Sequence, residues 1–156
     1  MDTQTIELIG RHRLMSELMH AGLEVALPMR DRGIDLIAYV DLSSKVRSFL
    51  ATPIQMKAAS TRSFSIDKKY EKISNVMLAH VWHLNTPDQA VTYGLRYPEA
   101  VAIAEELGWT KTTSWQRNGR YSTSNPSKNL CALLEAHRMS PDKWWNCVVN
   151  ASKASD

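Results

Sequence analysis

The sequence predicts an α/β fold in which a mixed sheet of about five strands is flanked by helices. Three observations predict it: an amphipathic segment at residues 3–21, apolar runs of strand length between turn residues, and later segments that open with helix-start residues. A chain of 156 residues has the length of one domain. We therefore expect a single domain, with a core at 3–110 and a C-terminal helical elaboration at 111–156.

The N-terminal segment 3–21 has the pattern of an amphipathic helix, and Gly22 is a natural helix stop. On the helix surface, Glu7 and Arg11 fall in line with the apolar residues, whereas Glu17 is expected on the opposite side. The apolar stripe consists of Leu14, Met15, Leu18 and Met19. We expect this helix on one side of the sheet and the C-terminal helices on the other.

Three segments predict a meander of strands: residues 23–28, 34–40 and 49–58, with a polar turn at 41–47. Two more apolar runs, 75–82 and 91–95, predict a central strand and a neighbour beside it.

The remaining segments lack strand patterns or carry helix signals. Residues 59–73 are small, polar and basic, which favours a loop followed by a short helix. Helix signals mark a segment from Pro98 to the stop at Gly108, and two further starts at Pro126 and Ser140. Residues 110–127 are predicted to be a polar link.

Composition sets few limits on function. The formal net charge of +3 permits nucleic acid as a partner without requiring it. The sequence has neither a signal-peptide pattern nor an apolar run of bilayer length, so we expect a cytoplasmic protein without a membrane partner. Cys131 and Cys147 are expected to be reduced thiols.

A constellation of polar residues lies where two predicted strands run side by side. Side chains alternate along a strand, so Gln55 and Lys57 project from one face while Met56 points away. Asp35 on the adjacent strand can sit level with them. Its carboxylate, the Gln55 amide oxygen and the Met56 backbone carbonyl are suitable ligands for a hard cation, with Lys57 beside the attacking water. This pattern predicts a metal-dependent phosphodiesterase site.

These residues resemble the PD-(D/E)XK nuclease superfamily, which includes restriction enzymes and Holliday-junction resolvases. The resemblance is carried by residues 33–36 and 54–57, after an amphipathic helix and a short strand, and covers roughly residues 3 to 83. It implies a restriction-endonuclease-like fold and Mg²⁺-dependent or Mn²⁺-dependent hydrolysis of DNA. Asp35 would be a metal ligand, and Lys57 would orient or activate water.

The sequence departs from the family pattern at two positions. Gln55 stands where the family has its second acidic ligand. Arg11 stands where resolvase-like members carry a helix glutamate, and Glu7, one turn earlier on the same face, is the candidate replacement. These departures keep open a catalytically silent nuclease-fold module that binds nucleic acid or a protein partner.

Basic residues outside the constellation are candidate nucleic-acid contacts, although a solvated charged surface explains them equally well. They are Arg62, Lys68, Lys69, Lys72, Arg117 and Arg120. Asp31 is a further metal neighbour or simply a turn residue. His80 and His83 point to opposite faces of a strand, so they are expected in the core or at the strand end rather than on one ion. A homodimer is plausible, because two-fold symmetry lets a short protein address both strands of a duplex.

Overall fold

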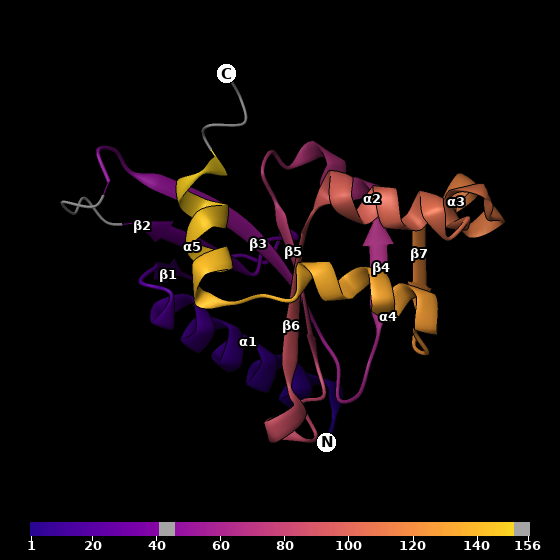
Figure 1. The fold of residues 1–156 in the computed structure, drawn as a ribbon, viewed down its shortest axis with the longest axis horizontal. Coiled ribbons are helices and arrows are strands. Elements are labelled where there is room, and N and C mark those ends of the chain that lie inside the picture. Colours follow the sequence, from indigo (N-terminus) through magenta and orange to yellow (C-terminus); the bar gives the residue numbers. More distant parts are fainter. Residues whose placement is uncertain (41–45, 152–156) are drawn as a thin grey trace.

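The computed structural model describes residues 1–40 and 46–151 and has the predicted α/β architecture (Figure 1). A five-stranded mixed sheet has the order β1-β2-β3-β5-β6, and a separate two-stranded sheet pairs β4 with β7. The first sheet comprises β1 (Glu24–Ala26), β2 (Leu36–Val40), β3 (Leu50–Ala58), β5 (Met77–Trp82) and β6 (Val91–Arg96), and the second comprises β4 (Phe64–Asp67) and β7 (Arg120–Thr123).

Helices flank the sheets on both sides (Figure 1). The α-helices are α1 (Thr3–His20), α2 (Tyr97–Glu106), α3 (Thr113–Asn118), α4 (Lys128–Leu134) and α5 (Pro141–Val149). Short 3-10 helices lie at η1 (Lys68–Lys72), η2 (Pro87–Gln89), η3 (Trp109–Lys111) and η4 (Glu135–His137). No helix within residues 1–40 and 46–151 combines the length and the apolar character needed to cross a bilayer.

The predicted meander is present, since β1, β2 and β3 pair antiparallel in sequence order. β5 pairs parallel to β3 and antiparallel to β6, which makes the sheet mixed. β5 lies between two strands and is buried along its whole length, as its continuous apolar run predicts. The turn expected at 41–47 falls largely on residues 41–45, which lie outside the described residues.

The two faces of the five-stranded sheet carry separate apolar clusters. One cluster joins the inward residues of β2 and β3 to α1 and α5, and the other joins β5 and β6 to α2, α4 and the two-stranded sheet. Figure 1 shows α1 and α5 lying along β1 to β3, apart from α2, α3 and α4. The expectation that the C-terminal helices all lie opposite α1 is therefore wrong for α5, because Trp144 and Val148 bury themselves in the α1 cluster.

Helix α1 approaches β3 closely at Gly10. A Cβ atom at this position would lie 2.7 Å from the Cβ of Ala58, so only glycine allows the contact. The buried stripe consists of Ile6, Gly10, Leu14 and Leu18, whereas the predicted stripe residue Met19 is exposed. Glu17 faces inward rather than away, since its carboxylate accepts hydrogen bonds from Thr92 on β6 at 2.8 Å and from Trp144 on α5 at 3.4 Å.

The two-stranded sheet is absent from the sequence predictions, which assigned residues 59–73 to a loop and short helix and 110–127 to a link. Phe64 and Ile66 alternate with polar residues on β4 and are buried. β7 pairs with β4 antiparallel, and the backbone N–H of Lys68 donates to the carbonyl of Gly119 at 2.7 Å. The partners are more than fifty positions apart, so no local pattern reveals their pairing.

His80 is a buried core residue, as its place on β5 predicts. Its ring stacks on Phe64 with centroids 4.3 Å apart. Burial, together with the positive charge of Lys57 on β3, lowers the pKa of His80 from 6.5 to about 3. The ring is therefore neutral in the folded protein at neutral pH.

The neutral His80 predicts acid sensitivity. Its folded-state pKa lies below the unfolded value, so its contribution to stability is complete above pH 6.5 and is lost as the pH falls from 6.5 toward 3. The loss should reach about 2 kcal/mol between pH 6.5 and 5. Denaturant unfolding across this range should show a shallower fall for His80→Gln than for wild type. The matched control is His12→Gln on the exposed side of α1. If the free energy of unfolding falls equally with pH in wild type and His80→Gln, His80 does not have a lowered pKa.

Candidate functional site

The predicted constellation is assembled where β2 and β3 part. The last backbone contact between the strands is the hydrogen bond from the Asp35 N–H to the Ile54 carbonyl, at 2.9 Å. Beyond it, the N–H and C=O of Met56 face a side of β3 that β2 no longer covers. The Asp35 carboxylate accepts from the Met56 N–H at 2.7 Å, and the Gln55 amide donates to the Met56 carbonyl at 2.9 Å. Two side chains thus take the place of a strand.

Asp35 and Gln55 also contact each other. The Gln55 Nε2 atom lies 3.2 Å from Asp35 Oδ2, so one amide group bridges that carboxylate oxygen and the Met56 carbonyl. The register explains this contact, because Leu36 pairs with Ile54 and the next residues outward are Asp35 and Gln55. The structure therefore brings the Asp35 carboxylate, the Met56 carbonyl and the Gln55 amide together, with the amide nitrogen rather than the predicted amide oxygen facing the other two groups.

The electrostatic surroundings of Asp35 are mixed. Burial raises the pKa of this carboxyl group above its ordinary value, the Met56 hydrogen bond opposes the shift, and the charge of Asp31 adds to it. The positive charges of Arg11 and Lys57 lower the pKa by smaller amounts. A partly buried carboxylate with a raised pKa gains most from a nearby cation, which favours its charged form.

One pocket of about 340 Å³ contains the whole predicted site, which we call the site pocket. Glu7 reaches it because the close contact at Gly10 holds the first turns of α1 against the end of β3. The Glu7 carboxylate lies 2.8 Å from the Arg11 guanidinium, so these two residues of α1 form an ion pair. The lining residues include Glu7, Asp35, Gln55, Met56 and Lys57.

The turn before β2 completes one wall of the site pocket. Asp31 accepts a hydrogen bond from the backbone N–H of Gly33 at 3.1 Å, as expected of a turn residue, and also lines the pocket. Gly33 has a φ of +92°, a conformation that residues with a Cβ rarely adopt. This turn places Asp31 on the same side as Asp35.

Tyr70 lines the site pocket and is absent from the sequence predictions. Its ring is buried although its neighbours in η1 are charged. Burial and the charges of Asp67, Asp35 and Asp31 raise the pKa of its phenol to about 12, so the group is a hydrogen-bond donor at neutral pH. A single aromatic residue inside a charged run was the only signal in the sequence that marks this position.

The chemistry of the donor set fits a hard cation such as Mg²⁺ or Mn²⁺. In residues 1–40 and 46–151, no three His, Cys, Asp or Glu side chains lie close enough to hold a metal together. The oxygen atoms that converge here come instead from the Asp35 carboxylate and the Met56 backbone carbonyl, and the Gln55 amide presents its nitrogen to both. Rotation of the Gln55 amide about its last bond would exchange Nε2 for Oε1 and turn a third oxygen toward the other two.

The predicted nucleic-acid contacts divide into two groups. Lys69 lines the site pocket, and Arg120 lines a neighbouring pocket of about 220 Å³. The other four basic residues line neither pocket. Arg62 is exposed beside the Cys131 thiol, Lys68 lies over the Trp115 ring at 5.2 Å, and Lys72 and Arg117 are exposed on the surface.

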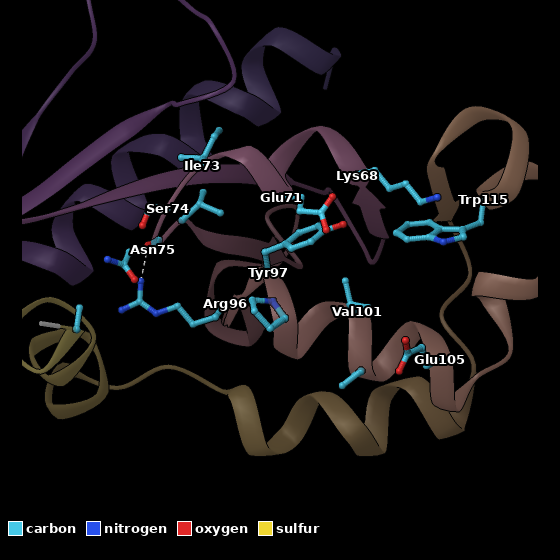
Figure 2. A pocket seen from close by; sticks show the side chains of 14 residues that line it. Lys68, Glu71, Ile73, Ser74, Asn75, Arg96, Tyr97, Val101, Glu105 and Trp115 are labelled. Atoms are coloured by element: carbon cyan, nitrogen blue, oxygen red, sulfur yellow. Dashed lines mark hydrogen bonds between the residues drawn. The ribbon is translucent and has the colours of Figure 1, made fainter. Parts of the chain in front are cut away.

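A second cavity, of about 650 Å³, shares no lining residue with the site pocket. Figure 2 shows Tyr97 and Val101 of α2 across from η1, with Lys68 beside Trp115 at one end. Arg96 at the other end donates to the backbone carbonyls of Asn75 and Cys147, so its guanidinium is engaged by the protein. This cavity is mainly apolar and lacks the convergent oxygens of the Asp35 cluster.

Comparisons of the chain with protein-family models, curated proteins and solved structures find no match.

Removal of the Asp35 carboxylate should destabilise the fold. Asp35→Ala leaves the buried N–H of Met56 without its acceptor, so we expect the free energy of unfolding to fall by about 1–3 kcal/mol. Asp35→Asn keeps an acceptor oxygen and should lose less. Urea unfolding measures both, with Asp31→Ala as the control carboxylate in the exposed turn. An Asp35→Ala protein as stable as wild type would contradict the structural role of this carboxylate.

Proposed function

We propose that this protein is a metal-dependent nuclease that hydrolyses DNA phosphodiester bonds, with Mg²⁺ or Mn²⁺ as its cofactor. The observation that carries the proposal is the convergence of Asp35 Oδ2 and the Met56 carbonyl on one amide group, inside a pocket that also contains Lys57. Such oxygens suit a hard cation, and an ammonium group beside them suits a phosphate.

Each residue has a distinct task in this proposal. Asp35, the Met56 carbonyl and the rotated Gln55 amide would hold the cation, which supplies Lewis acidity and lowers the pKa of a bound water. The Lys57 ammonium donates hydrogen bonds that orient the attacking water and offset the negative charge that develops on the phosphate oxygens. Glu7 adds a carboxylate at the pocket once it leaves Arg11.

The second candidate is a nuclease-fold module that binds nucleic acid or a protein partner without cutting. The observation in its favour is that the Gln55 amide already satisfies both Asp35 and Met56 by hydrogen bonds, while Arg11 neutralises Glu7. A site whose oxygens are satisfied internally has less to gain from a cation. DNA is the proposed partner of the nuclease, and nucleic acid or a protein is the proposed partner of the silent module. The cytoplasmic location and the homodimer both remain predictions.

Cleavage assays separate the two candidates. We expect purified protein to cut supercoiled, linear or branched DNA in Mg²⁺ or Mn²⁺, and Asp35→Asn and Lys57→Ala to lower the rate about 10²-fold or more. Lys111→Ala is the matched control, because it removes an exposed lysine that lies outside the site pocket and is not among the predicted nucleic-acid contacts. If wild type cuts none of these substrates, or if the site variants cut as fast as Lys111→Ala, the nuclease proposal is wrong.

Gln55→Glu tests the metal site without relying on cleavage. Without metal, the new carboxylate would face Asp35 and could no longer donate to the Met56 carbonyl, so stability should fall by about 1–3 kcal/mol. Added Mg²⁺ should then raise the unfolding temperature of Gln55→Glu more than that of wild type. Gln116→Glu on the surface of α3 is the matched control. If Mg²⁺ raises the unfolding temperature equally in all three proteins, Gln55 is not part of a metal site.

A further inference from the structure

The site pocket adjoins the neighbouring pocket of about 220 Å³, which we call the flanking pocket. Lys57, Lys69 and Tyr70 line both pockets. The flanking pocket extends onto the two-stranded sheet, where Ser65 of β4 and Arg120 and Ser122 of β7 line it. Its polar groups are cationic side chains, hydroxyls and the Asp67 carboxylate.

The residues that line the two pockets differ in formal charge. In the site pocket, the lining carboxylates of Glu7, Asp31 and Asp35 outnumber the two shared lysines by one, and Arg11 offsets Glu7 from outside the lining. In the flanking pocket, the same lysines and Arg120 face only Asp67, which leaves two net positive charges. This excess of positive charge suits an anion.

Arg120 is held in place by the protein and still has free donors. Its Nη2 lies 3.1 Å from Asp67 Oδ2, and these two residues are register partners of β7 and β4. Asp67 itself is fixed, because its other carboxylate oxygen accepts from the Lys69 N–H at 2.9 Å. The Arg120 side chain is 66% exposed, and a guanidinium has five N–H donors, so the bond to Asp67 leaves most of them available for a ligand.

We propose that the flanking pocket binds a non-scissile phosphate of the DNA strand, next to the phosphodiester held in the site pocket. The position of this phosphate along the DNA strand rests on the proposed nuclease function. The affinity of the flanking pocket for an anion rests on the positive charges of Lys57, Lys69 and Arg120. The Ser65 and Ser122 hydroxyls supply further hydrogen bonds to phosphate oxygens. The two-stranded sheet is therefore a substrate-binding element.

The test is DNA binding by Arg120→Gln, measured by fluorescence anisotropy with labelled single-stranded and duplex oligonucleotides over a range of salt. Asp35→Asn serves as the background without divalent metal, so that cleavage cannot intervene. Loss of one phosphate contact should weaken binding about 5- to 10-fold and reduce the slope of log affinity against log salt by about 1. Arg120→Lys keeps the charge and should recover part of the affinity.

Arg47→Gln is the matched control, because Arg47 is an exposed arginine that lines neither pocket and is not among the predicted nucleic-acid contacts. Circular dichroism confirms that each variant is folded. If Arg120→Gln binds like the background protein, or if Arg47→Gln loses as much affinity, the flanking pocket is not a phosphate site. The same conclusion holds if the background protein binds no DNA even at low salt.

The outcomes also separate this inference from the nuclease proposal. Binding that depends on Arg120, in a wild-type protein that cuts nothing in Mg²⁺ or Mn²⁺, would support the phosphate site and reject the nuclease. Cleavage that depends on Asp35 and Lys57, with Arg120→Gln binding and cutting like wild type, would reject the phosphate site and leave the nuclease proposal standing.

Discussion

The peptide group of Met56 sets the central constraint on this structure. The chain first pairs with β3 at Asp35, just before β2 begins, so the N–H and C=O of Met56 lack the partners that a longer β2 would supply. Buried backbone groups without partners cost about 1–3 kcal/mol each, so the chain must satisfy them by other means. It uses the Asp35 carboxylate for the donor and the Gln55 amide for the acceptor. The opening between the strands becomes a polar pocket instead of a defect.

This solution links stability to the proposed chemistry. The same two oxygens, Asp35 Oδ2 and the Met56 carbonyl, accept hydrogen bonds from Gln55 and are the ligands proposed for a cation. The amide nitrogen and a cation therefore compete for one position. Neutral hydrogen bonds contribute about 1 kcal/mol each, whereas a divalent cation next to a partly buried carboxylate acts on a full charge at reduced dielectric. In the proposed metal-bound state, the amide rotates and gives up these two hydrogen bonds.

Strand alternation explains why much of this arrangement could be predicted from the sequence. Gln55 and Lys57 had to share a face of β3, and an antiparallel neighbour ending near Asp35 placed the carboxylate level with Gln55. Periodicity alone could not show that β4 and β7 pair, because their contacts join distant parts of the chain. Contacts between distant parts of the chain also bring Arg120 and Tyr70 close to Lys57 and hold α5 beside α1. Periodicity therefore did not predict these two neighbours of Lys57, and it placed α5 on the wrong side of the sheet.

Charge balance offers a reason for a neutral Gln55 beside Asp35 and for Arg11 beside Glu7. A glutamate at position 55 would put a second carboxylate within hydrogen-bonding distance of Asp35, where Asp31 already raises the pKa of the group. Two such carboxylates cannot both stay ionised without a compensating cation, so the neutral amide keeps the site folded when no metal is present. Arg11 likewise compensates the negative charge of Glu7 by forming an ion pair with it. The shared lysines Lys57 and Lys69 line both the site pocket and the flanking pocket, so the proposed phosphodiester and the proposed second phosphate would both meet positive charge.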